Sequence, residues 1–191
     1  RVLAHLKRQL ADRVTIHTFG CGDDELRAFV DSNADINDAT KLLTHHGTLA
    51  RAELATLFAQ ADVFLDMSFW QAFGRTGLEA MAAGCVPVLP VGSGAEEYAL
   101  HATNAMLHNT SDYRDAVEQI VSLVRAPAKL HTMRLEALAT STRYDSSIAS
   151  LRMLTLFCHT MATLSVLPTP SPCVETMKLK EIKNSRLAMI S

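Results

Sequence analysis

The stretch SFWQAFGRTGLEAMAAGCVPVLP, residues 68–90, joins a glycine-containing turn to an apolar helix and then to an apolar strand. Its pattern predicts a helix over residues 75–84. Gly74 and Gly77 put small residues at the start of this helix, where the first backbone N–H groups have no partner within the helix. These N–H groups carry partial positive charge and Arg75 adds a full one, so the helix start favours an anionic ligand.

Strand-like and helical patterns alternate along the chain as far as Val124. The expected strands are residues 14–18, 41–46, 63–67, 85–90 and 104–108, and the expected helices are residues 2–10, 24–30, 51–61, 75–84 and 113–124. Such alternation with short turns is typical of an α/β fold, in which helices cover both faces of an open parallel sheet. Ligands of these folds bind beyond the carboxyl ends of the strands. Glycine-containing loops fall at that edge and predict a cleft, at residues 20–22, 46–47, 68–77 and 92–97.

Two polar side chains near the predicted helix start suit a nucleotide that carries a sugar. Glu79 lies one turn into the helix, where its carboxylate can accept hydrogen bonds from both hydroxyls of a ribose. Gln71 offers an amide to a sugar hydroxyl, and glycine at positions 74 and 77 lets a diphosphate approach. The alternative is that Glu79 only complements the helix dipole and that the helix is ordinary core.

The composition fits one domain with a core of its own: 191 residues, 48% hydrophobic and 20% charged. A formal net charge of −2 gives no general attraction to nucleic acid or to an anionic membrane. The four cysteines show no metal-ligand spacing, and Cys85 is expected to be buried, which favours a reducing compartment. Residues 148–167 are apolar but contain Arg152 and His159, so we expect a packed helix rather than a membrane span.

Two further features have open interpretations. The adjacent His45 and His46 would point to opposite faces of a strand, so they are not expected to share a metal ion. A contact from one of them to a nucleotide stays open. Trp70 either stacks on a sugar or base or covers the edge of the domain.

Residues 58–100 resemble the carboxyl-terminal domain of retaining glycosyltransferases with two Rossmann-like domains, the GT-B architecture of the glycosyl transferases group 1 type. The family pattern has Ser, an acid, Phe-Gly, Glu-Ala-Met-Ala-x-Gly and then Pro-Val. The corresponding residues here are Ser68, Gln71, Phe73, Gly74, Glu79–Gly84, Pro87 and Val88. The resemblance extends loosely over residues 1–160. It implies a Rossmann-like parallel sheet with helices on both faces, one half of a GT-B enzyme.

The resemblance also implies a donor site for a UDP- or GDP-sugar. Glu79 would bind the ribose, while Phe73, Gly74 and Arg75 would line the diphosphate and the sugar. The further substrate-binding positions that it implies are Gly20, Gly22, Gly47 and Glu97. Such enzymes transfer the sugar to an acceptor hydroxyl with retention and without a metal or another cofactor. The saccharide or other acceptor would bind to an amino-terminal domain, which we expect to lie outside this chain. No catalytic residue is identified.

Gln71 departs from the family, which usually has Glu at this position. The amide keeps the capacity to form hydrogen bonds but loses the charge. It indicates either a subgroup of active enzymes or a non-catalytic module that keeps the fold for binding or assembly.

The composition changes after Met161. We expect a donor-binding domain, incomplete at its start, at residues 1–162, a linker at 163–173 and a truncated helical tail at 174–191. The tail resembles a helix start of chlorophyll a/b-binding light-harvesting proteins, which implies Glu181 and Asn184 as ligands of chlorophyll magnesium in a fusion. A charged amphipathic helix of chance similarity is the alternative. The main domain predicts a cytoplasmic protein, whereas a genuine light-harvesting tail implies a plastid.

Overall fold

The computed structural model describes residues 1–32 and 43–164. The chain divides into a compact unit, Arg1–Asp145, and a second unit that begins at Ser146. The first unit contains every strand that the described residues form. The expected tail, with Glu181 and Asn184, lies outside the described residues, as does most of the expected linker.

A parallel three-stranded sheet lies at the centre of the first unit. Its order is β3 (Val63–Leu65), β4 (Val86–Pro90) and β5 (Met106–His108). The register pairs Val63 with Val86 and Val88 with Met106. Every residue of β4 is buried, as its continuous apolar sequence requires of a strand covered on both faces.

A second parallel ladder joins β1 (His17–Thr18) to β2 (Thr44–His45). Both strands are shorter than the sequence predicts. Each pairs with only one neighbour among the described residues, so few hydrogen bonds support it. The loops that follow the two strands also meet, because the Gly20 N–H donates to the Gly47 carbonyl at 2.9 Å. Among the described residues, the strands form two separate ladders, β1–β2 and β3–β4–β5.

Helices connect the strands in the alternation that the sequence predicts. They are α1 (Val2–Leu10), α2 (Asp23–Asp31), α4 (Arg51–Gln60), α5 (Arg75–Ala82), α6 (Tyr113–Arg125) and α7 (Pro127–Ser141). The prediction omitted α7. Its signal is Pro127, which occupies a first-turn position where a missing N–H costs nothing.

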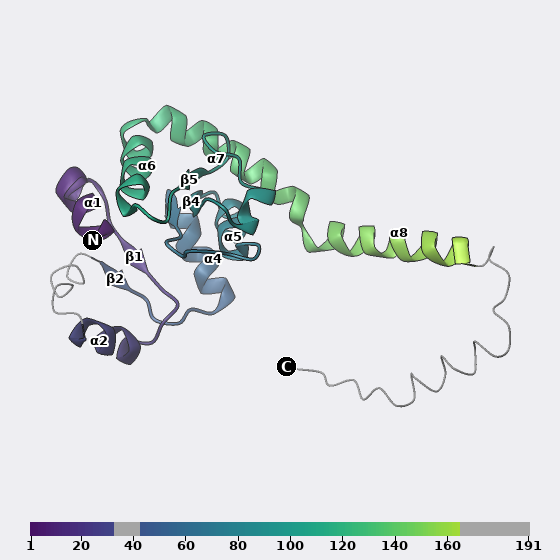
Figure 1. The fold of residues 1–191 in the computed structure, drawn as a ribbon, viewed down its shortest axis with the longest axis horizontal. Coiled ribbons are helices and arrows are strands. Elements are labelled where there is room, and N and C mark those ends of the chain that lie inside the picture. Colours follow the sequence, from purple (N-terminus) through teal and green to yellow (C-terminus); the bar gives the residue numbers. More distant parts are fainter. Residues whose placement is uncertain (33–42, 165–191) are drawn as a thin grey trace. The chain divides into compact units, whose positions relative to one another are not determined.

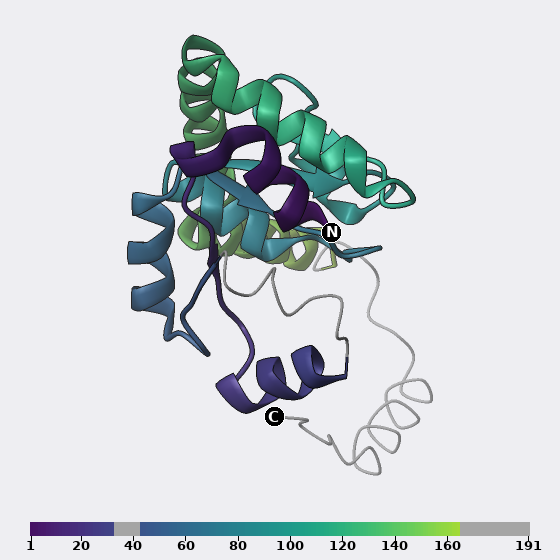
Figure 2. The same cartoon turned by 90° about the vertical axis from the view of Figure 1, so that its left-hand side faces the viewer.

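The core forms on both faces of the central sheet because alternate residues of β4 point in opposite directions. Val86 and Val88 belong to a cluster with Leu6 and Leu10 of α1. Figures 1 and 2 show α1 beside α6, which packs against the same face. Leu89 points the other way, into a cluster that includes residues of α5 and the loop after β4. The expected α/β fold with helices on both faces is confirmed.

Cys85 immediately precedes β4 and is fully buried, as predicted. Its thiol donates to the carbonyls of Phe58 and Ala61 at 3.0 and 3.3 Å. Burial raises the pKa of the Cys85 thiol to about 11 from an ordinary 9.0.

We expect iodoacetamide at pH 8 to modify the exposed Cys158 quickly and Cys85 only on unfolding. A rise of two pH units in the pKa leaves about 100-fold less thiolate at this pH, and thiolate is the reactive species. Mass spectrometry of labelled peptides, with and without urea, measures this difference. Equal labelling of both cysteines in the native protein contradicts it.

The second unit begins with α8 (Ser146–Leu164), so a helix near residues 148–167 is present. The expected packing is not seen, because the described side chains of α8 are exposed. None of the helices in the described ranges has the length and apolarity that crossing a membrane requires. The expected domain limit at residue 162 stays a prediction.

Candidate functional site

The loop between β3 and α5 is held by a chain of side-chain hydrogen bonds. Asp66 Oδ1 accepts from the Ser68 N–H at 2.8 Å and from the Ser68 hydroxyl at 2.6 Å. The Gln71 amide nitrogen in turn donates to Ser68 Oγ at 2.8 Å. Because the Ser68 proton is already directed at Asp66, position 71 must supply a donor. A glutamine can do this and a glutamate cannot, which gives the departure at Gln71 a local physical cause.

Gly74 is the N-cap of α5 and has a left-handed backbone, with φ 74° and ψ 47°. Glycine adopts this conformation without the steric cost that a Cβ brings. The Gly74 carbonyl accepts from the N–H groups of Gly77 and Leu78 at 3.0 and 3.4 Å. No side chain of the described residues caps the helix, so the N–H groups of Arg75 and Thr76 are the ones left for an anion.

Two expectations about Gly77 are wrong. Its N–H is used inside the helix, as described above, and its Cα faces the protein interior rather than a ligand. A Cβ at this position would lie 2.8 Å from Tyr98 Oη and 2.9 Å from a methyl of Leu89. Gly77 is therefore small because α5 packs closely on β4 and Tyr98.

Glu79 lies one turn into α5 at its surface, between two guanidinium groups. Its Oε1 is 3.2 Å from Arg51 Nη2 and 3.5 Å from Arg75 Nη2. The Glu79 side chain is only 34% exposed, whereas both arginines are largely in solvent. Ion pairs this exposed contribute little to stability, so a ligand can replace them at small cost.

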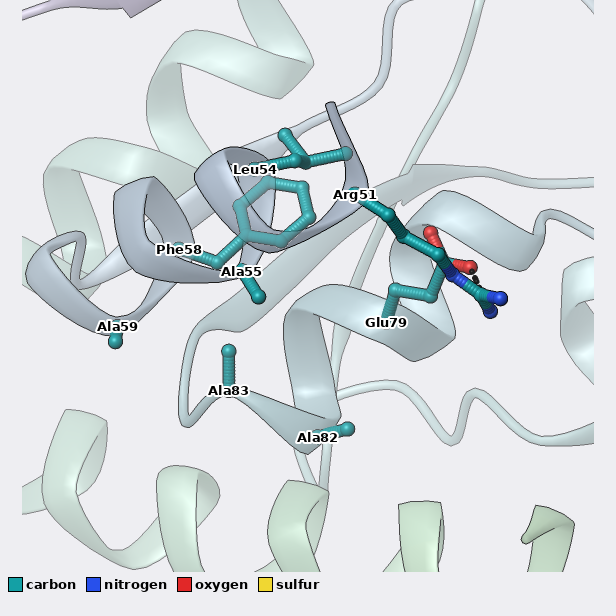
Figure 3. Close-up of a pocket in the computed structure, with 8 residues that line it drawn as sticks. All are labelled: Arg51, Leu54, Ala55, Phe58, Ala59, Glu79, Ala82 and Ala83. Atoms are coloured by element: carbon teal, nitrogen blue, oxygen red, sulfur yellow. Dashed lines mark hydrogen bonds and ion pairs between the residues drawn. The ribbon is translucent and has the colours of Figure 1, made fainter. Parts of the chain in front are cut away.

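Glu79 and Arg51 stand at the rim of a cavity of about 370 Å³ between α4 and α5. Figure 3 shows the two side chains pointing toward each other from the two helices. The remaining lining residues are apolar: Leu54, Ala55, Phe58, Ala59, Ala82 and Ala83. Sequence reasoning missed Arg51. Its only signal is its place at the first turn of α4, shortly after the loop that contains Gly47.

The loop after β4 packs directly against the loop that contains Gln71. The Gly94 N–H donates to the Gln71 carbonyl at 2.8 Å, and a Cβ on Gly94 would overlap the Ala72 carbonyl. Gly94 begins the short 3-10 helix η3 (Gly94–Glu97), whose last residue is exposed. This contact brings Glu97 into the same part of the molecule as Gln71, Phe73 and Gly74.

Gly20, Gly22 and Gly47 form a second group at the ends of β1 and β2. Gly22 is the N-cap of α2, and its N–H donates to Glu25 Oε2 at 2.9 Å. His45 and His46 have different partners, as predicted: His45 Nε2 is 3.1 Å from the Cys21 carbonyl, and His46 Nε2 is 2.9 Å from His17 Nδ1. In the described ranges, no three His, Cys, Asp or Glu side chains form a group suited to a metal ion.

The fold and this site define an α/β domain in which Glu79 and Arg51 line an apolar cavity, and Arg75 at the start of α5 lies beside Glu79. The family described as glycosyl transferases group 1 matches residues 1–139. The chain therefore belongs to the glycosyl transferases group 1 family.

Known relatives agree with this assignment over part of their length. A D-inositol 3-phosphate glycosyltransferase of Paenarthrobacter aurescens is 33% identical over 105 residues, which cover 53% of this chain and 24% of that protein. The chain thus spans about a quarter of this curated relative.

Solved structures show the same fold. Sucrose-phosphate synthase of Thermosynechococcus elongatus has a TM-score of 0.73 at 18% identity, over 85% of this chain and 42% of that one. HepE of Anabaena, solved with UDP and glucose, has a TM-score of 0.66 at 23% identity, over 87% and 44%. The carboxyl-terminal domain of the group 1 protein LpcC of Francisella tularensis has a TM-score of 0.64 at 16% identity, over 76% and 77%. The Rossmann-like fold expected for one half of a GT-B protein is confirmed.

Proposed function

We propose that this domain binds the donor, a UDP- or GDP-sugar, of a glycosyltransferase. The observation that carries the proposal is the position of Glu79: a half-buried carboxylate beside the uncapped start of α5, at the rim of an apolar cavity. A carboxylate there can accept hydrogen bonds from both hydroxyls of a ribose. The structure of HepE with UDP and glucose supports the choice of ligand.

In this proposal, the diphosphate lies at the start of α5. The N–H groups of Arg75 and Thr76 and the guanidinium groups of Arg75 and Arg51 meet its negative charge. The side chains of Gln71 and Glu97 and the main chain of Phe73 and Gly74 lie beside the sugar, while Gly20, Gly22 and Gly47 shape the edge of the cleft near the base. Arg51 supplies positive charge from within this chain.

The proposed reaction transfers the sugar to an acceptor hydroxyl with retention. The bond from the anomeric carbon to the diphosphate breaks, a bond to the acceptor oxygen forms on the same face, and the hydroxyl proton leaves with the diphosphate. Because helix N–H groups and arginines stabilise the departing charge, the proposal needs no metal ion. The acceptor and the amino-terminal domain that binds it belong to the proposal for the whole protein.

A non-catalytic, binding role is the second candidate, and the observation that favours it is the neutral Gln71, whose amide nitrogen is engaged by Ser68. The two candidates differ in turnover but not in binding. Release of UDP or GDP from a nucleotide-sugar by the whole protein, including the proposed acceptor-binding domain, supports the enzyme. Saturable binding by the whole protein without release supports the module.

Calorimetric titration with UDP, GDP and the matching monophosphates tests the donor site. We expect one diphosphate to bind saturably and its monophosphate to bind at least tenfold more weakly, because the second phosphate makes the contacts to α5. Arg75→Gln should weaken binding of the diphosphate about threefold to tenfold. Arg27→Gln is the matched control, because Arg27 pairs with Asp24 on α2. Equal binding of diphosphate and monophosphate, or no binding by the folded protein, contradicts the proposal.

A further inference from the structure

Tyr98 lies directly beneath the start of α5 and is only 3% exposed. It follows η3, and its hydroxyl donates to the Gly74 carbonyl at 2.5 Å. Its ring packs edge-to-face against Phe73, with centroids 5.4 Å apart, and against Tyr144 at 6.0 Å. One side chain therefore connects the loop before α5 with the loop after β4.

The hydroxyl fits a space that is left by two glycines, one at the N-cap of α5 and one within the helix. A Cβ on Gly74 would lie 2.9 Å from Tyr98 Oη, and one on Gly77 would lie 2.8 Å from the same atom. The Gly74 carbonyl is also the acceptor that closes the first turn of α5. The tyrosine hydroxyl thus holds the carbonyl that closes the first turn of the helix.

The hydroxyl remains a proton donor at every physiological pH. Burial, and secondarily the charge of Asp66, raise the pKa of Tyr98 far above its ordinary value of 10.0. The main chain of Tyr98 is fixed as well, because its carbonyl accepts from the buried Asn104 side chain at 2.8 Å. The contact to Gly74 is consequently held from both ends of the residue.

We propose that Tyr98 is a positioning residue for the donor site, which sets the direction of the free N–H groups at the start of α5 through its hydrogen bond to Gly74. This inference rests on the proposed function for its consequence in binding. It assigns a role to a residue that does not touch the ligand. Tyr98 would act chiefly on the diphosphate, because the N–H groups that it directs meet the phosphates, whereas Glu79 lies one turn further along α5.

Tyr98→Phe removes the hydroxyl and keeps the ring. Tyr144→Phe is the matched control, because it removes a hydroxyl from the same aromatic cluster. This hydroxyl donates to the Glu97 carbonyl at 3.2 Å and not to Gly74. We expect Tyr98→Phe to weaken binding of the nucleoside diphosphate about tenfold and binding of its monophosphate less than twofold. Tyr144→Phe should change both by less than twofold. Thermal unfolding of each variant verifies that the compared samples are folded.

Amide hydrogen exchange provides a second measurement that needs no ligand. Exchange of residues 74–78 should accelerate in Tyr98→Phe and stay unchanged in Tyr144→Phe. If the unaltered protein binds no nucleotide, the proposed function fails, and exchange alone decides whether Tyr98 orders the helix start. Unchanged exchange at residues 74–78 overturns the inference. An equal loss of affinity for diphosphate and monophosphate, or equal effects of the two variants, also overturns it.

Discussion

Glu79→Gln is expected to weaken UDP or GDP binding by about 10- to 100-fold. Hydrogen bonds to a charged acceptor contribute about 1.5–3 kcal/mol each, and the substitution removes that charge while keeping the shape. An opposite effect also operates, because Arg51 and Arg75 lose their partner and become freer to bind phosphate. Exposed ion pairs contribute no more than about 1 kcal/mol, so the loss of the ribose contact dominates.

The ribose assignment has a sharper test with a 2′-deoxy nucleotide. The unaltered protein should prefer the ribonucleoside diphosphate to its 2′-deoxy form, and Glu79→Gln should abolish most of this preference. Glu118→Gln, at an exposed position on α6, is the control for a general loss of negative charge. A preference that survives in Glu79→Gln places the ribose elsewhere. Titration calorimetry measures all six combinations of protein and nucleotide.

Gly94→Ala is expected to produce the largest loss of stability among single methyl additions in this domain. The new Cβ would overlap the Ala72 carbonyl, so one of the two loops must move and the hydrogen bond from Gly94 to Gln71 must lengthen or break. We expect a loss of about 3 kcal/mol in the free energy of unfolding, as for other overpacked sites. Chemical denaturation measures it.

Gly92→Ala is the matched control in the same loop. Gly92 also has a positive φ, of 69°, but its Cβ would meet no atom within 4 Å. It should therefore lose only about 1 kcal/mol from backbone strain. Equal losses from the two substitutions would mean that the Ala72 contact relaxes freely, contrary to this expectation.

The sequence predicts those parts of the structure in which local pattern and tertiary packing agree. The apolar run of β4, the helix after Gly74 and the buried position of Cys85 all follow from their local sequence. The short length of β1 does not, because strand ends depend on how many neighbours pair with them.

The candidate site divides in the same way. The positions of Gly74 and Glu79 at one helix start are inherent in their spacing. Arg51 approaches Glu79 from another helix, 28 residues earlier, and no local pattern records such a contact. Gly77 shows the reverse error: a glycine near a predicted ligand suggests a close approach of that ligand, but the close approach here comes from Tyr98 and Leu89.

The hydrogen-bond chain from Gln71 through Ser68 to Asp66 also links two positions in the evolution of the site. Ser68 has one hydroxyl proton, and Asp66 accepts it. A glutamate at position 71 would then face the lone pairs of Ser68 near a second carboxylate, a repulsive arrangement. An acid at position 71 is therefore disfavoured while Asp66 is present, and we expect homologous sequences to carry the negative charge at one of these two positions more often than at both.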